Sequence, residues 1–93
     1  MKKIDEELLE ELSFYAGLMF SKKEIAFILE FTFDEFRELL EDDSSPAAKN
    51  LLVGRLKKES EVRKSIFDLA SNGSSPAQAF AMKLIENAKM DDI

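Results

Sequence analysis

One segment near the N-terminus constrains the fold more than any other part of the chain. Residues 22–41 have the sequence KKEIAFILEFTFDEFRELLE, in which apolar residues recur with helical spacing in two short runs separated by a turn. Ile25 and Leu29 share one face of the first run, and Phe36 lies on the apolar face of the second. Two helices this short cannot each bury a face alone, so they must cross closely at a small residue such as Ala26. The spacing predicts a helix-turn-helix.

Capping signals divide the rest of the chain into further helices. Ser21 with Glu24, and Thr32 with Glu35, have the spacing of a capping box. Serine followed by proline recurs twice, which is typical of a helix start, and strand signals are missing. We therefore expect an all-α protein of about five helices, which would cover residues 4–19, 22–29, 33–42, 46–72 and a last helix from Ser75-Pro76 with Gln78 completing a third capping box.

These helices are expected to form a single domain over residues 1–93. Residues 1–43 would form the part that contains the helix-turn-helix, a tri-helical unit. Residues 44–93 would form a long helix followed by a C-terminal helical hairpin, which turns at Asn72-Gly73. We expect this second part to mediate oligomerisation.

The long fourth helix is not uniform along its length. Its apolar stripe is interrupted after Gly54, so residues 54–61 are expected to form an exposed bridge or a kink. On another face, Val53 and Phe67 align with lysines, which is unusual for a face exposed to solvent alone. We therefore expect a homo-oligomer whose subunits touch through the fourth and fifth helices.

Composition excludes several kinds of chemistry. The chain has no Cys and no His, which excludes a zinc site, a disulfide, a thiol nucleophile and an imidazole base. The adjacent acids Glu10-Glu11 and Asp42-Asp43 would point apart on a helix, and no glycine-rich phosphate loop accompanies them. We expect no enzymatic activity, no cofactor and no metal. Without a signal peptide or a long apolar run, a cytoplasmic protein away from the membrane is expected.

The charges are distributed unevenly. Residues 1–43 hold five Lys or Arg and thirteen Asp or Glu, whereas residues 44–93 hold eight and six. If DNA is bound, the basic side chains of the long fourth helix, which include Lys57 and Lys64, would supply much of the attraction to phosphate. The alternative is an ordinary solvated helix face.

The second helix of the motif has mixed chemistry for a DNA-binding element. In such motifs this helix lies in the major groove. Arg37 suits a bidentate contact with guanine, and Lys22 and Lys23 could hold a phosphate, but three carboxylates would oppose a polyanion. The outward positions are expected to be Phe33, Asp34, Arg37, Glu38 and Glu41. In the alternative interpretation the motif is a tight core without groove contacts, and the core holds Phe14, Phe20, Phe27, Phe31, Phe33 and Phe36.

Two segments resemble a known family. They are residues 21–40, SKKEIAFILEFTFDEFRELL, and residues 54–88, GRLKKESEVRKSIFDLASNGSSPAQAFAMKLIENA. Over about residues 13–89 the chain resembles the terminase small subunits and related helix-turn-helix proteins of phages and prophages. The resemblance implies a non-enzymatic protein that recognises double-stranded DNA for packaging, forms homo-oligomers and regulates a large terminase subunit. It places on the DNA-facing side Lys22, Lys23, Thr32, Phe33 and Arg37.

A second function is compatible with the same residues. The acidic second helix and the net-acidic first half fit a protein-protein adaptor that keeps a helix-turn-helix fold without DNA binding.

Overall fold

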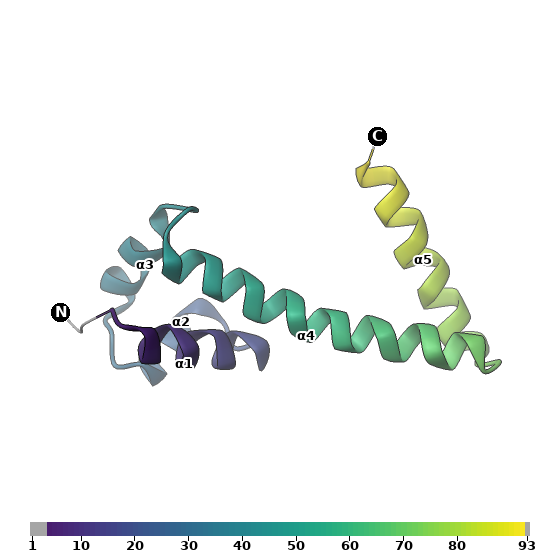
Figure 1. The fold of residues 1–93 in the computed structure, drawn as a ribbon, viewed down its shortest axis with the longest axis horizontal. Helices are drawn as coiled ribbons and strands as arrows, with labels where there is room; N and C mark the ends of the chain where they lie inside the picture. Colours follow the sequence, from purple (N-terminus) through teal and green to yellow (C-terminus); the bar gives the residue numbers. More distant parts are fainter. Residues whose placement is uncertain (1–3, 93) are drawn as a thin grey trace. The chain divides into compact units, whose positions relative to one another are not determined.

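The computed structural model describes residues 4–92, and every regular element in that range is an α-helix (Figure 1). The five helices are α1 (Glu6–Gly17), α2 (Lys22–Ile28), α3 (Phe33–Glu41), α4 (Pro46–Ser71) and α5 (Ser75–Asp91). The expected all-α class and the expected set of helices are confirmed. Their predicted bounds are shifted by two residues or fewer, because the capping signals lie at the observed helix starts.

Two capping boxes begin the short helices α2 and α3. The backbone N–H of Glu24 donates to the Ser21 hydroxyl at 3.1 Å, and the Ser21 N–H donates to the Glu24 carboxylate at 3.0 Å. Thr32 and Glu35 make the same pair of bonds at 3.1 and 3.2 Å. These bonds satisfy backbone donors that the first turn of a helix leaves unpaired, so both starts are fixed locally.

A serine hydroxyl caps each of the two long helices. Ser45 caps α4 as expected, its hydroxyl accepting a first-turn backbone N–H at 3.1 Å. The predicted third capping box at the start of α5 is wrong. The capping residue is Ser74, and the Gln78 side chain donates to the Ala70 carbonyl at 3.1 Å instead of returning to the cap. The Gln78 side chain makes this bond because the last turns of α4, which contain Ala70, lie within its reach.

Three helices end with the same backbone motif. After α2, the Phe31 N–H donates to the Ala26 carbonyl at 2.9 Å, which requires Glu30 to adopt a left-handed conformation with φ of 63°. Met19 after α1 and Gly73 after α4 occupy the equivalent positions, with φ of 65° and 99°. Glycine adopts this conformation without steric cost, whereas Met19 and Glu30 do not.

The chain divides into two compact units. The first, unit 1, ends at Lys58, and the second, unit 2, begins at Glu59. The division therefore falls inside α4, whereas the sequence-based division after residue 43 falls before this helix begins. Helix α4 is assigned as one continuous helix through residues 54–61.

Unit 1 contains the apolar core. The core side chains come from α1, α2, α3, the turn after α2 and the first turns of α4, and they include the fully buried Phe36. The complete cluster consists of Leu8, Leu12, Ala16, Ile25, Ala26, Leu29, Phe31, Phe36, Ala47 and Leu51.

Helices α1 and α4 approach each other very closely in unit 1. A Cβ atom placed on Gly54 would lie 2.3 Å from the Ser13 carbonyl oxygen, a distance that no side chain tolerates. Asn50 donates to the Leu9 carbonyl at 3.1 Å beside this crossing. Gly54 is therefore buried against α1 as a packing residue, and the expectation that an exposed bridge begins at this position is wrong.

The phenylalanines of unit 1 are divided between core and surface. Phe31 and Phe36 are buried, as the core interpretation expects. That interpretation is wrong for Phe14, Phe27 and Phe33, which are 61%, 86% and 41% exposed. The reason is clearest in α2, where Phe27 lies opposite the apolar side that already packs into the core.

Unit 2 contains the end of α4 and the whole of α5. Among its described residues, the buried apolar side chains are Ala77 and Ala81, both on the first turns of α5. The exposed large apolar side chains of unit 2 are Val62, Phe67, Leu69, Phe80, Met82, Ile85 and Met90.

Candidate functional site

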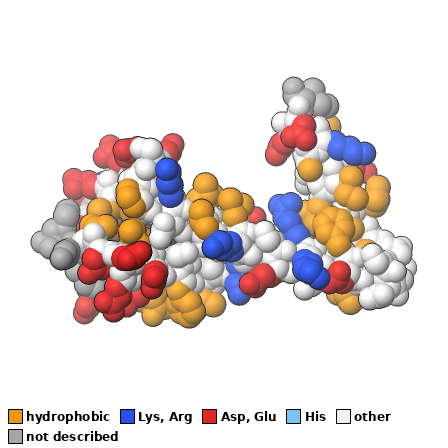
Figure 2. Space-filling view, viewed as in Figure 1, with side chains coloured by type: hydrophobic (Ala, Val, Ile, Leu, Met, Phe, Trp, Pro, Cys, Tyr) orange, Lys and Arg blue, Asp and Glu red, His pale blue; other side chains and the backbone are white. Residues whose placement is uncertain are grey.

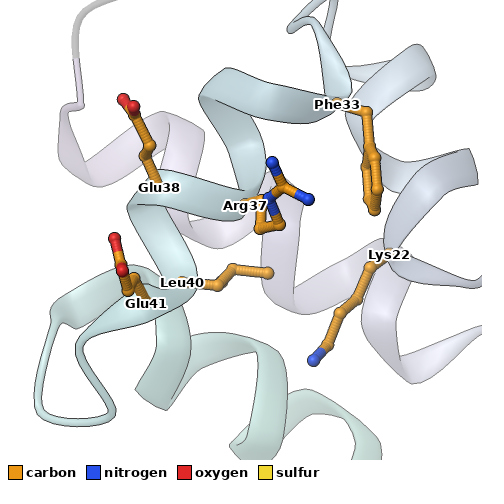
Figure 3. Close-up of a pocket in the computed structure, with 6 residues that line it drawn as sticks. All are labelled: Lys22, Phe33, Arg37, Glu38, Leu40 and Glu41. Carbon is orange, nitrogen blue, oxygen red and sulfur yellow. The ribbon is translucent and has the colours of Figure 1, made fainter.

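The N-terminal end of α2 and the outer face of α3 border an open groove of about 660 Å³ (Figure 3). Lys22 and Phe33 are the first helical residues after the N-cap residues Ser21 and Thr32. The two caps therefore fix where these side chains leave the backbone. The groove is lined by Lys22, Phe33, Arg37, Glu38, Leu40 and Glu41.

An exposed aromatic ring with cations beside it forms one end of the groove. The Nζ atom of Lys23 and the Cζ atom of Arg37 each lie 5.9 Å from the centre of the Phe33 ring. Cations at this distance are attracted to the ring face, and an exposed contact of this kind contributes about 0.5–1 kcal/mol. Together with Lys22, these residues form what we call the basic-aromatic end of the groove.

Arg37 also forms an ion pair with Asp34. Its Nη2 atom donates to the Asp34 carboxylate at 3.1 Å, one turn earlier on α3. The two side chains are 69% and 84% exposed, so this ion pair adds little stability. Its effect is to orient the guanidinium group, which keeps other N–H donors available for a ligand.

The opposite end of the groove is acidic. In Figure 3 the carboxylates of Glu38 and Glu41 point away from the side where Phe33, Arg37 and Lys22 lie. The three outward carboxylates of α3 are therefore not equivalent, because Asp34 is paired with Arg37 while Glu38 and Glu41 form a separate acidic end. A ligand with negative charge would meet the basic-aromatic end.

Thr32 is the N-cap of α3, the helix that supplies most of the groove lining. Its hydroxyl accepts the Glu35 N–H, so the predicted DNA contact at Thr32 falls on a group that already caps the helix. Interactions with the Thr32 hydroxyl and N–H hold the pKa of Glu35 below its ordinary value. The pKa of Glu24 is lowered in the same way by the Ser21 N–H and then by the Ser21 hydroxyl. Both capping carboxylates are charged at neutral pH.

The predicted basic residues of α4 lie outside the groove lining. Lys57 is an exposed residue of unit 1, and Lys64 belongs to unit 2, where it donates to Asp68 at 2.9 Å. Arg55, another basic residue of α4, is half-buried and donates to the Phe20 carbonyl at 3.1 Å. Arg55 therefore supports the turn after α1.

The groove brings together some of the residues that the sequence predicts for DNA contact and leaves others outside its lining. Of the predicted DNA-facing residues, Lys22, Phe33 and Arg37 line the groove, Lys23 lies beside the Phe33 ring, and Thr32 caps α3 outside the lining. The five predicted outward positions of α3 are exposed. The role of Leu40 was missed, although it follows Phe33 by two helical turns. The Asp34 to Arg37 pair was also missed, although its spacing of three residues is a usual one for a helix.

Comparisons with known proteins add no relative to this description. No family model, no curated protein and no solved structure matches the chain. Within residues 4–92, no helix has the length and apolar character needed to cross a membrane. The same range contains no group of three or more acidic side chains that could hold a metal ion.

Proposed function

We propose that α2 and α3 form a helix-turn-helix that binds double-stranded DNA, in a protein of phage or prophage origin similar to a terminase small subunit. The geometry that supports the motif is a seven-residue α2, a short turn and a nine-residue α3. Ala26 is 1% exposed, in agreement with a close approach of the two helices. In this proposal α3 enters the major groove and the start of α2 lies near the backbone.

The basic-aromatic end of the groove carries the proposal. Lys22 and Lys23 supply phosphate contacts, because ammonium groups hold phosphates as point charges. Arg37, which is exposed beside Asp34 and the Phe33 ring, would make a bidentate contact with guanine, and Phe33 would make an apolar contact with a thymine methyl group. These are the residues that the family resemblance places on the DNA-facing side.

Affinity per subunit is expected to be low. The acidic end of α3 faces the same polyanion, and the chain has a net charge of −6. Lys57 and Lys64 on α4 would provide additional phosphate contacts, and assembly of several copies on one duplex would raise the overall affinity. In the proposed packaging role, the assembled protein would recognise DNA and regulate a large terminase subunit.

Self-association is the second part of the proposal. Unit 2 exposes 39% of Phe67 and 59% of Phe80, and such surface is usually covered in a stable assembly. We expect a homo-oligomer that sediments as more than one chain, and Phe67→Ser with Phe80→Ser should shift it toward smaller species. A parent protein that remains a monomer at high micromolar concentration would contradict this part.

A protein-protein adaptor is the alternative, and one observation favours it. Glu38 and Glu41 give the groove an acidic end next to the apolar Leu40, which would fit a basic, apolar partner helix better than a phosphate backbone. In that case the motif would keep its fold and would not bind DNA.

Fluorescence anisotropy with labelled duplex DNA separates the two functions. At low salt the parent should bind, and Lys22→Glu with Lys23→Glu should weaken binding by about tenfold or more and reduce its salt dependence. Lys57→Glu with Lys64→Glu should have a similar effect. The matched control is Lys83→Glu with Lys89→Glu on α5, which makes the same change of charge far along the sequence and should preserve binding.

Arg37 tests recognition separately from attraction. Arg37→Ala should alter the preference among duplex sequences more than it alters overall affinity, because it removes a base contact. If the parent binds no duplex DNA at low salt, or if the lysine variants bind like the parent, the adaptor function takes first place.

A further inference from the structure

Charges of opposite sign are segregated on two helices of unit 1. Residues 4–21, which include α1, contain five acidic residues and no Lys or Arg. Residues 44–58, which include the first turns of α4, contain three Lys and one Arg but no Asp or Glu. Such separation gives one chain two surfaces of opposite potential.

The outer face of α1 combines acid with exposed apolar surface. Glu7 and Glu10 are exposed and lie on the same side of the helix as Phe14 and Leu18, which are 61% and 50% exposed. Figure 2 shows acidic and hydrophobic side chains next to each other over the edge of unit 1 where Figure 1 shows α1. We call Glu7, Glu10, Phe14 and Leu18 the acidic face.

The outer face of α4 in unit 1 is its counterpart. Leu52, Val53 and Leu56 are 58%, 43% and 49% exposed. Lys49 and Lys57, which are exposed as well, stand at the two ends of this apolar strip. We call these five residues the basic face. Helical geometry gives the acidic face a length of about 16 Å and the basic face about 12 Å, so the two surfaces are similar in extent.

The described contacts between α1 and α4 within unit 1 involve other residues than these two faces. Helices α1 and α4 meet through Ser13 and Gly54, and through the bond from Asn50 to the Leu9 carbonyl. These residues lie on the inner sides of both helices, whereas the two faces are on the outer sides. The complementary faces of one chain are therefore turned away from each other.

We propose that the acidic face of one copy docks on the basic face of a second copy. A second copy is the occupant because one sequence supplies both the negative and the positive surface, each with apolar residues to bury. The contact joins two different surfaces, so every copy retains one unoccupied face for the next, and assembly proceeds head to tail. This inference deepens the proposed self-association by adding a contact in unit 1, and it does not depend on DNA binding.

Charge reversal on each face provides the test. The first variant carries Glu7→Lys with Glu10→Lys, and the second carries Lys49→Glu with Lys57→Glu, all at exposed positions. At low salt, sedimentation velocity should show that each variant alone forms smaller species than the parent. An equimolar mixture should restore the size of the parent assembly, because each reversed face then meets an opposite charge on the other variant.

Controls separate loss of the contact from loss of the fold. Circular dichroism should give all variants the helicity of the parent, and Lys22→Glu with Lys23→Glu, which makes the same change of charge on α2 outside both faces, should leave the assembly unchanged in the absence of DNA. Raising the salt concentration should weaken the parent contact, since exposed ion pairs are screened.

Three results would overturn the inference: a parent that is monomeric at low salt, single variants that assemble like the parent, or a mixture that does not recover. Anisotropy with duplex DNA on the same samples keeps the two proposals distinct. If complementation fails while the parent still binds DNA, the docking contact alone is wrong. If complementation succeeds while the parent binds no DNA, the docking contact stands and the DNA-binding function fails.

Discussion

Unit 1 and unit 2 are both helical, but they bury very different amounts of apolar surface. Ten apolar side chains form the core of unit 1, and the largest of them, Phe36, has no exposed surface. In the described part of unit 2, the buried side chains are two alanines, while Phe67 and Phe80 remain exposed. An apolar stripe therefore becomes a core when several helices surround it, as in unit 1. It stays largely exposed when only one other helix packs against it, as in unit 2.

Burial along α5 illustrates the difference. Ala77 and Ala81 near its start are each 6% exposed, whereas Ile85 on the next turn is 37% exposed. Helix pairs with so little buried surface are marginal in water, so local caps matter more for unit 2, and the proposed self-association would add to its stability. The following predictions test this contrast, beginning with the largest expected effect.

Phe36→Ala should destabilise unit 1 by about 3–5 kcal/mol, because it removes a fully buried aromatic ring. Chemical unfolding followed by circular dichroism measures this loss. Phe80→Ala is the matched change in unit 2, and it should leave the stability of the single chain nearly unchanged while weakening self-association. Equal losses of stability from the two substitutions would contradict the contrast between the units.

Gly54→Ala should cost about 3 kcal/mol, since the new methyl group would overlap the Ser13 backbone, which cannot rotate away. Gly17→Ala is the control, because its Cβ would lie 3.4 Å from the nearest atom outside its own helix. That control should be neutral or slightly stabilising. An unfolding curve for Gly54→Ala that matches the parent would mean that α1 and α4 do not approach this closely.

Glu30→Gly should stabilise unit 1 by about 1 kcal/mol, since glycine adopts the left-handed conformation that Glu30 now holds under strain. Gly73→Ala makes the opposite change at the equivalent position after α4, and it should lower the helicity of unit 2. Thermal unfolding of both variants measures the two effects. If Glu30→Gly lowers the midpoint, other interactions of the glutamate outweigh the backbone strain.

Acid should weaken the capping boxes of α2 and α3. The folded-state pKa values of Glu24 and Glu35 lie below the ordinary value of 4.5, so their contribution is present above that pH and is lost as the pH falls through the lowered pKa values. The variant Glu24→Gln with Glu35→Gln places an amide, which does not titrate, in each capping box. Between neutral pH and pH of about 3, the unfolding midpoint of this variant should therefore fall less than that of the parent. This is the smallest of the predicted effects.

Glu38→Gln with Glu41→Gln is the control for the acid experiment, because it removes two charges from α3 without touching a cap. Its midpoint should follow the pH dependence of the parent more closely than that of the capping variant. If the capping variant and the parent lose stability in parallel, the capping carboxylates do not couple folding to pH.

Helix starts and ends were predictable from sequence because their causes are local. Capping boxes bring together residues three positions apart, so Ser21 with Glu24 and Thr32 with Glu35 could be recognised directly. Position on a helix also predicted which residues of α3 face outward. The capping box predicted for α5 was wrong because the Gln78 side chain donates to the Ala70 carbonyl of α4, and local spacing does not encode such a partner.

The sequence by itself determined the all-α class, the approximate helix bounds and which residues of α3 face outward. Tertiary structure decided which phenylalanines are buried, since Phe36 and Phe27 differ in what packs against them and not in residue type. It also decided that Gly54 is a contact between α1 and α4, because that role depends on a helix about forty residues earlier in the chain. Local hydrogen bonds follow from sequence spacing, whereas burial depends on which distant surfaces meet.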